Sequence, residues 1–187
     1  MKVKGYGVNL RSMQQADIEM VRQWRNSPVL LPFMHNRRII SAQQQNEWFN
    51  SIDNLHNHYF IVEYENEDIG FCSLKNIEFD TLKVEPGLFV ATQEYLGSPV
   101  GVAILITLME LGYIRWGLSF YYGHVLASNS RAISNYQAIG AEVEPGQSPE
   151  SVTLVFRDYS PDKPKIDRAK QMLIQYFNCA PELVITQ

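Results

Sequence analysis

The chain has 187 residues, which fits one domain and is too short for two ordinary ones. Hydrophobic residues make up 45% of the sequence and charged residues 19%, so a core can form and wholesale disorder is excluded. The formal net charge of −4 lacks the basic excess of a general nucleic-acid binder, and we expect no nucleic-acid partner.

The N-terminal part predicts a short strand at residues 8–11 and a helix at 16–25, whose apolar residues recur at helical spacing. A loop at 27–40 follows. Ser41 and Gln44 have the spacing of a capping box, which predicts the start of a second helix.

Three strands are expected next. Residues 58–64 are rich in β-branched and aromatic side chains, and the turn at 65–68 leads into a second strand at 69–77. The two strands should form a hairpin. A further strand is predicted at 83–91.

The second half alternates helices with strands. Ser98 as N-cap and Pro99 at the first helical position predict a helix over 99–114, which is apolar almost all round and should be buried. The remaining predicted elements are a strand at 118–126, a short helix ending at Gly140, a strand at 152–158 and a helix at 162–177 begun by Asp162 and Pro164. This order predicts an α/β fold with βαβ units in a mixed sheet.

Two segments are candidates for chemistry. In the first, a strand runs through a glycine-containing loop at 97–101 into a helix N-terminus, where free amides and the helix dipole favour an anion. Taken alone, the segment favours an ordinary capped connection between a strand and a helix. The second is the helix that begins at Asn129 and carries Tyr136, whose ordinary role would be packing.

Together the two segments resemble the GCN5-related N-acetyltransferase (GNAT) superfamily. Its helix pattern Asn-x-x-Ala/Ser-Ile-x-x-Tyr-x-x-x-Gly matches at Asn129, Ala132, Ile133, Tyr136 and Gly140. Its pyrophosphate loop, Arg/Gln-x-x-Gly-x-Gly/Ala, falls on residues 96–101 and matches less well. Leu96 stands for the first residue, and Pro99 replaces a glycine whose N–H the family uses.

The N-terminal half is similar to a branch with ribosomal-protein N-terminal acetyltransferases and amino-sugar acetyltransferases. The similarity covers about residues 8–158 and leaves 159–187 as a helical C-terminal extension of a single domain. It implies a mixed, mostly antiparallel twisted sheet flanked by helices. The residues that carry this similarity are Leu10, Arg11, Asp17, Val21, Trp24, Arg25, Asn26, Ile40, Ser41, Trp48, Phe49, Ile69, Gly70, Glu85 and Gly87.

The resemblance implies acetyl transfer from acetyl-CoA, a co-substrate, to an amine, without a metal. Tyr136 would protonate the departing thiolate, and the backbone amides of Phe89 and Val90 would hold the thioester or the pantetheine. The remaining residues that the resemblance places at the cofactor are Leu96, Gly97, Ser98, Gly101 and Asn129.

The base that deprotonates the amine has two candidates. Glu85 lies near the start of the cofactor strand, where some relatives keep a carboxylate, and is equally an exposed strand-end residue. His124, on the next strand, titrates in a suitable range, although a single strand histidine is more often a packing residue.

The acceptor is expected against the first two helices and the loop between them. His35, Arg37 and Arg38 are the candidate binding residues, and a catalytic role of His35 is an equal alternative. Although either arginine alone is more often a solvated loop residue, the arginines suit a phosphate or carboxylate. This favours an amino sugar or a sugar nucleotide. The alternatives are a protein N-terminal acetyltransferase and a non-catalytic domain that binds CoA or a partner through a degenerate loop.

Other features set expectations about compartment and partners. Cys72 and Cys179 lack the spacing of a disulfide framework or a zinc site. The N-terminus has no apolar region typical of a secretory signal, and the ten apolar residues at 100–109 are too few to span a bilayer. We expect a cytoplasmic protein with no membrane partner, and its edge strands are compatible with a homodimer.

Overall fold

The computed structural model describes residues 1–186, and within them nine strands form one sheet in the order β7-β8-β6-β5-β4-β3-β2-β1-β9. Over these residues neighbouring strands are antiparallel, except for the parallel pair β5 and β6. The expected mixed, mostly antiparallel sheet is confirmed. The strands are β1 (Lys2–Gly5), β2 (Val8–Ser12), β3 (His58–Tyr64), β4 (Glu67–Glu78), β5 (Lys83–Val90), β6 (Phe120–Leu126), β7 (Glu142–Pro145), β8 (Ser151–Phe156) and β9 (Val184–Thr186).

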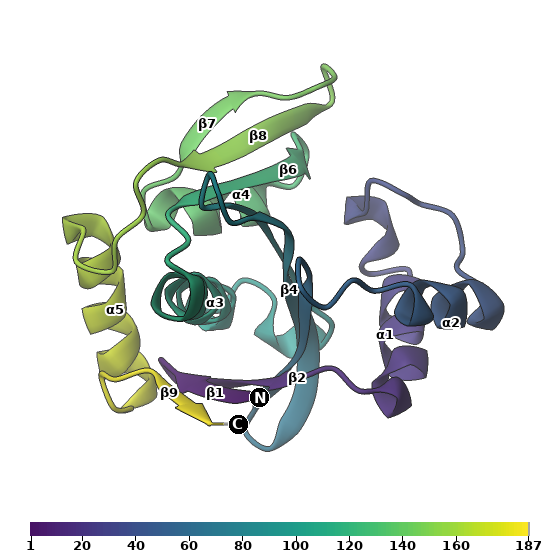
Figure 1. Cartoon of the computed structure of the whole chain (residues 1–187), viewed down its shortest axis with the longest axis horizontal. Helices are drawn as coiled ribbons and strands as arrows, with labels where there is room; N and C mark the ends of the chain where they lie inside the picture. Colours follow the sequence, from purple (N-terminus) through teal and green to yellow (C-terminus); the bar gives the residue numbers. More distant parts are fainter. Residues whose placement is uncertain (187) are drawn as a thin grey trace.

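Helices cover both faces of this curved sheet. The long helix α3 lies in its hollow with α5 beyond it, while α1 and α2 lie side by side against the opposite face (Figure 1). The helices are α1 (Ile18–Arg25), α2 (Ala42–Asn50), α3 (Val100–Trp116), α4 (Ser130–Ala138) and α5 (Pro164–Phe177), and the short 3-10 turns are η1 (Gln15–Asp17), η2 (Leu31–Phe33) and η3 (Gln93–Tyr95).

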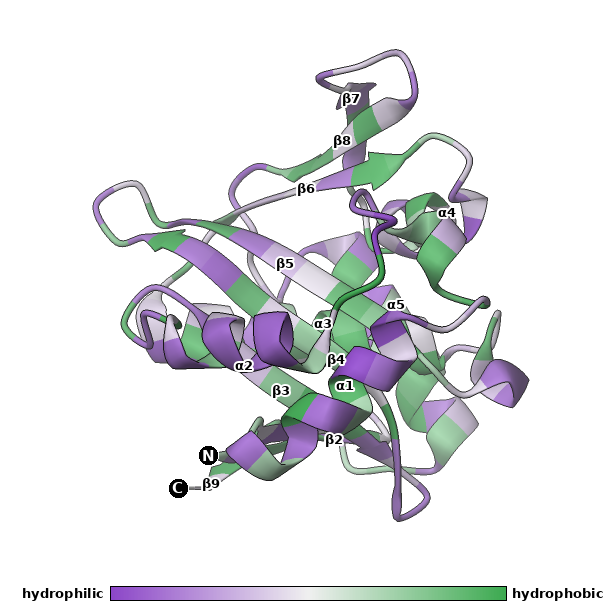
Figure 2. Cartoon of the chain, turned by 90° about the vertical axis from the view of Figure 1, so that its right-hand side faces the viewer, coloured by the Kyte–Doolittle hydropathy of each residue, from purple (hydrophilic) through white to green (hydrophobic). Residues whose placement is uncertain are grey.

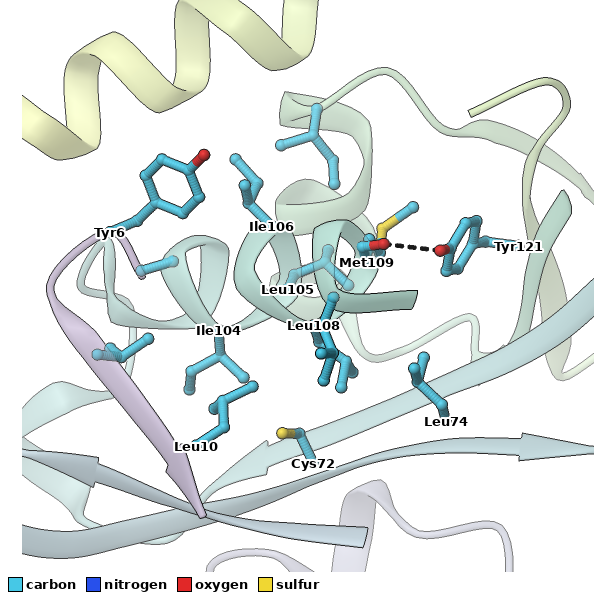
Figure 3. Packing of buried hydrophobic residues seen from close by; sticks show 14 of the residues in the cluster. Tyr6, Leu10, Cys72, Leu74, Ile104, Leu105, Ile106, Leu108, Met109 and Tyr121 are labelled. Atoms are coloured by element: carbon cyan, nitrogen blue, oxygen red, sulfur yellow. Dashed lines mark hydrogen bonds between the residues drawn. The ribbon is translucent and has the colours of Figure 1, made fainter. Parts of the chain in front are cut away.

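The main core surrounds α3, as the apolar sequence of this helix predicts. Leu105, Ile106 and Leu108 are fully buried, and the Tyr121 hydroxyl donates to the Met109 carbonyl oxygen at 2.7 Å (Figure 3). No helix within residues 1–186 has the length and hydrophobicity needed to cross a membrane.

One carboxylate is buried on α3 and ties it to its neighbours. Glu110 accepts hydrogen bonds from the Tyr6 hydroxyl and from Lys170 Nζ of α5, the latter at 3.3 Å. A buried charge is tolerated when it is paired and hydrogen-bonded in this way. The contact fixes α5 across α3, so the C-terminal helix packs on the same core.

A second apolar cluster lies between the sheet and α1 and α2. Val21 of α1 and Phe71 and Phe89 of the sheet are buried there, with Trp24 and Trp48 packed against them. The outer surface of α2 is hydrophilic (Figure 2). The predicted capping box at the start of α2 is confirmed by reciprocal bonds between Ser41 and Gln44.

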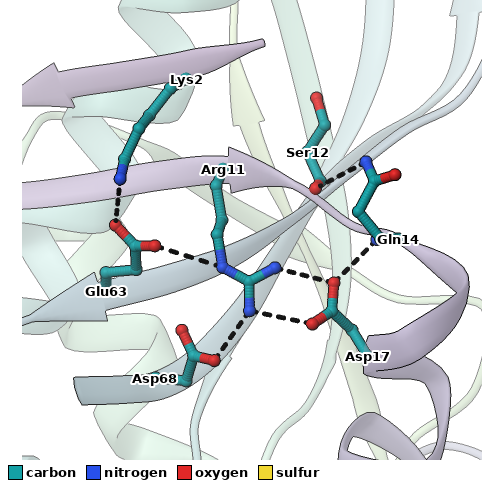
Figure 4. A network of polar contacts seen from close by, with 7 residues as sticks. All are labelled: Lys2, Arg11, Ser12, Gln14, Asp17, Glu63 and Asp68. Atoms are coloured by element: carbon teal, nitrogen blue, oxygen red, sulfur yellow. Dashed lines mark hydrogen bonds and ion pairs between the residues drawn. The ribbon is translucent and has the colours of Figure 1, made fainter. Parts of the chain in front are cut away.

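An arginine on β2 holds the start of α1 in place. The guanidinium of Arg11 donates to both carboxylate oxygens of Asp17 at 2.7 and 2.9 Å, and it also meets Asp68 and Glu63 (Figure 4). Burial raises the pKa of Asp17, but the Arg11 guanidinium and the Gln14 amide together hold it below its ordinary value.

The structure adds three short strands that the sequence pattern does not predict, β1, β7 and β9. It also corrects two helix starts. Helix α3 begins at Val100 with Pro99 as its N-cap residue, so Ser98 lies outside the cap position. Helix α5 has Pro164 in its first turn as predicted, but its N-cap residue is Lys163 and not Asp162.

Candidate active site

A cavity opens where β5 and β6 separate. In the described part of the chain these parallel strands pair at two positions, Lys83 with Phe120 and Val84 with Tyr121, and then diverge. The cavity has a volume of about 490 Å³ and runs from the loop before α3, between β5 and β6, to α1 and α2. This volume suits a small molecule.

The separation leaves backbone groups of β5 without a strand partner on that edge. Ala91 donates to the Ile69 carbonyl oxygen at 2.7 Å, and β5 pairs with β4 without a register shift from Glu85 to Val90. Because hydrogen-bonding direction alternates along an antiparallel strand, the amides of Leu88 and Val90 face the cavity and that of Phe89 faces β4. The amide of Val90 therefore faces the cavity, whereas the amide of Phe89, the other cofactor candidate on β5, faces β4 and that of Leu88 faces the cavity instead.

One end of the cavity is the loop before α3. Leu96, Gly97, Ser98 and Gly101 all line it, as predicted for a cofactor loop. The backbone of Gly97 has a φ of +86°, which favours glycine, and a β-carbon built there would meet no atom within 4 Å.

The donors of this loop are backbone amides. The first helical bond of α3 runs from the Ala103 amide to the Pro99 carbonyl oxygen, so the Gly101 amide has no helical partner within the described residues. The Ser98 hydroxyl donates to the Tyr95 carbonyl oxygen at 2.7 Å, so its proton is already engaged. Within this geometry the Ser98 hydroxyl is therefore not a free donor for a phosphate.

Helix α4 brings Asn129 and Tyr136 to the cavity. The Asn129 side chain caps the helix by accepting from the Ala132 amide at 3.2 Å. Tyr136 is 5% exposed, and its hydroxyl donates to the Pro86 carbonyl oxygen at 3.3 Å. Burial, followed by the charge of Glu85, raises the pKa of Tyr136, so its hydroxyl stays protonated and can donate a hydrogen bond.

Both candidate bases line the cavity, in different surroundings. The carboxylate of Glu85 accepts from Lys75 Nζ at 3.0 Å and from Asn76 Nδ2 at 2.9 Å, which occupies both oxygens. His124 is half-buried, and its Nδ1 lies 3.2 Å from the Thr153 hydroxyl. The carboxylate is therefore the more constrained of the two.

The loop at 27–40 reaches the cavity through His35 and not through the arginines. His35 Nε2 donates to the His124 carbonyl oxygen at 2.8 Å, which connects the loop to β6. Arg37 and Arg38 are exposed and do not belong to the cavity lining described over residues 1–186.

The end of the cavity near α1 and α2 has aromatic walls. Trp48 packs edge-on against Tyr59, and Tyr59, Phe71 and Phe89 stack in succession with ring centroids 5.8 and 5.3 Å apart. Phe89 also meets Trp24 edge-on. An acceptor in this half would rest on flat apolar surfaces.

The structure adds polar lining residues that sequence reasoning missed. They are Arg25, Gln45, Lys75, Arg131 and Asn135. Among them, Arg25 has a buried Nε without a hydrogen-bond partner within the described residues. No sequence signal marks these positions, because their exposure to the cavity depends on tertiary packing. Asn135 Nδ2 lies so close to Gly101 that a β-carbon there would come within 2.6 Å of it.

The comparisons with known proteins concern the family and the fold. The model of the acetyltransferase (GNAT) domain family matches residues 8–142. No curated protein sequence matches the chain.

Solved structures with the same fold include three acetyltransferases. A spermidine N-acetyltransferase from Vibrio cholerae, in complex with CoA and spermine, has a TM-score of 0.71 at 17% identity and covers 80% of this chain and 94% of its own. The aminoglycoside acetyltransferase AAC(6')-Ib with coenzyme A has a TM-score of 0.72 at 20% identity, covering 86% and 98%. RimL, a ribosomal L7/L12 α-N-protein acetyltransferase with CoA, has a TM-score of 0.69 at 13% identity, covering 82% and 96%.

Proposed function

Because the chain belongs to the acetyltransferase (GNAT) family and is an acyltransferase, we propose that it transfers the acetyl group of acetyl-CoA to a primary amine of a small molecule. The observation that best supports this proposal is the cavity between β5 and β6. A loop with free backbone amides, a protonated tyrosine and an aromatic acceptor region all line it. We propose that one acetyltransferase domain spans the chain, since β9 pairs with β1.

The residues at one end of the cavity fit a coenzyme A molecule. The amides of Gly97 and Gly101 would hold the pyrophosphate, although Pro99 contributes none. The cavity-facing amides of Leu88 and Val90 would bind the pantetheine or the thioester oxygen. Solved structures of the same fold contain CoA, which supports this assignment.

The proposed reaction has three requirements. The amine must first lose a proton, because an ammonium has no lone pair. Its nitrogen then attacks the thioester carbonyl carbon, and the carbon–sulfur bond breaks once the new carbon–nitrogen bond has formed. The nitrogen loses its second proton to water, which gives the neutral amide, and the tyrosine that protonates the sulfur recovers a proton from water. Tyr136 gives its proton to the departing sulfur, and an amide N–H of β5 stabilises the charge that develops on the carbonyl oxygen.

The acceptor that we favour is an amino sugar or a sugar nucleotide. The aromatic walls of the acceptor half suit a ring, and the charges of the lining suit an anionic substituent. The similarity to RimL keeps a protein N-terminus as the alternative acceptor.

Calorimetric titration of the purified protein with acetyl-CoA and with CoA tests the proposal first. Saturable binding, followed by CoA release in an acceptor screen that includes amino-sugar nucleotides and N-terminal peptides, would support it. No binding at millimolar ligand would overturn it and leave a domain whose loop is disabled by Leu96 and Pro99.

A further inference from the structure

A cation without a counter-charge lines the acceptor half of the cavity. Arg25, at the end of α1, is half-buried, and its Nε is buried without a hydrogen-bond partner in residues 1–186. Burial lowers the pKa of Arg25. Removing an arginine from water without pairing it costs stability, and native structures rarely accept that cost without use.

A second unsatisfied donor belongs to α2. Gln45 is 4% exposed and lines the same cavity, yet its Nε2 has no hydrogen-bond partner in the described part of the chain. Buried amide groups are nearly always hydrogen-bonded in native proteins. Two unpaired donors on adjacent helices therefore point to a ligand group rich in acceptor oxygens.

The charged residues that line the cavity also favour a ligand with negatively charged oxygens. Up to Thr186, its lining contains the cations Arg25, Lys75 and Arg131, and the single carboxylate of Glu85. Lys75 and Asn76 already hold that carboxylate. The surplus is positive although the whole chain carries a net charge of −4, so nothing in the cavity compensates Arg25.

We propose that Arg25 and Gln45 form a subsite for an anionic oxygen group, a phosphate or a carboxylate, on the acceptor that carries the amine. This inference rests on the proposed function and narrows it to acidic amino compounds, such as amino sugars with a phosphate or a carboxylate. A guanidinium pairs with such groups through two parallel hydrogen bonds. A polycationic amine meets no free carboxylate among the described lining residues.

The first test is thermal unfolding without ligands. Arg25→Met keeps an unbranched apolar chain in the same place and removes the uncompensated charge, so the melting temperature should stay level or rise by about 2–4 °C. The control is Arg22→Met on the same helix, because Arg22 pairs with Glu19 and donates to the Ile40 carbonyl oxygen. A larger fall for Arg25→Met than for Arg22→Met would show a structural arginine and overturn the proposal.

The second test is calorimetry of CoA-saturated protein with three amino sugars that share one ring. Glucosamine lacks an anion, glucosamine 6-phosphate adds a phosphate, and muramic acid adds a carboxylate. At least one anionic sugar should bind about tenfold tighter than glucosamine in the wild type, and Arg25→Met should lose that difference. The anionic sugar whose affinity exceeds that of glucosamine by the larger factor shows whether the subsite binds a phosphate or a carboxylate.

Two results would overturn the subsite. One is an anionic preference that persists in Arg25→Met, and the other is no preference for either anionic sugar in the wild type at millimolar ligand. Failure of the proposed function can be told apart from failure of the subsite, because it appears as a lack of CoA binding. The difference between wild type and Arg25→Met can then still be measured without CoA.

Discussion

The hydroxyl of Tyr136 donates a hydrogen bond of 3.3 Å to the carbonyl oxygen of Pro86, across the gap between α4 and the open edge of β5. This is a long bond by the standards of O–H···O contacts, so the hydroxyl can turn to a better acceptor. A thiolate formed at this edge is such an acceptor. The protonated tyrosine is thus held at the position that the proposed chemistry requires.

Tyr136→Phe should lower kcat about a hundredfold and change the Kd for CoA by about twofold or less, since only proton transfer to sulfur is removed. Initial rates of CoA release and calorimetry measure the two effects. Tyr121→Phe is the matched control, because the Tyr121 hydroxyl donates to a main-chain carbonyl of α3 in the core. It should cost stability and leave kcat near the wild-type value. Unchanged kcat in Tyr136→Phe would refute the role of the tyrosine as acid.

The base should be His124 and not Glu85. Both oxygens of Glu85 accept hydrogen bonds, whereas the contact of His124 Nδ1 with Thr153 orients the ring and leaves Nε2 for the amine proton. His124→Gln should lower kcat about a hundredfold or more, and Glu85→Gln less than about tenfold. The acidic limb of the pH–rate profile should disappear in the variant that lacks the base. A larger loss of kcat in Glu85→Gln than in His124→Gln would assign the role of base to Glu85.

The loop before α3 should bind CoA more tightly when it regains an amide. Pro99→Gly adds one N–H at the cofactor end of the cavity, and CoA affinity should rise roughly 3- to 10-fold. The free energy of unfolding should fall by about 0.4–1 kcal/mol, because glycine makes the unfolded chain more flexible. Pro164→Gly at the start of α5 is the control. It should lower the free energy of unfolding by a similar amount and leave the CoA affinity unchanged. Equal CoA affinity in Pro99→Gly and wild type would place the pyrophosphate elsewhere.

Stability should depend on pH through Asp17. Its pKa in the folded protein is held below the ordinary value of 3.8, so its stabilising contribution is complete above about pH 4 and is lost as pH falls through the folded-state pKa. At pH 7, Asp17→Asn should lower the free energy of unfolding by about 1.5–3 kcal/mol, and the difference should shrink in acid. Urea titrations at several pH values measure this.

Asp162→Asn is the control for that experiment, since Asp162 is exposed and makes no ion pair within residues 1–186. Its effect at pH 7 should stay within about 0.5 kcal/mol. A difference between wild type and Asp17→Asn that grows in acid would contradict the assignment.

Much of the architecture can be predicted from local patterns. The capping box at Ser41 and the apolar sequence of α3 mark two helices, and the alternating segments mark the central strands. The three missed strands are short, and one of them, β9, depends on a distant partner. Lys2 of β1 pairs with Thr186 of β9, which no local window of sequence contains.

The residues of the candidate site likewise fall into two groups, those that sequence motifs mark and those that only the folded structure reveals. Tyr136 and Gly101 belong to spaced motifs, so sequence places them at the cavity. Arg25 follows Trp24 in a helix and looks like any terminal arginine, because the lack of a partner exists only in the folded chain. The cavity-facing amide of Leu88 likewise depends on the register with β4, which side-chain identity does not encode.

A sheet that opens in its middle has strand edges inside the molecule as well as at its ends. Exposed edges invite strands of other molecules, which is how β-rich proteins begin to aggregate. The outer edge at β7 is blunted by Pro145 and by the pairs of Glu142 and Glu144 with Arg157. The inner edges of β5 and β6 border a cavity of about 490 Å³, which admits a small molecule and excludes the strand of a folded neighbour. The opening therefore makes the backbone groups of β5 and β6 accessible to a small ligand without creating an exposed strand edge that could pair with another molecule.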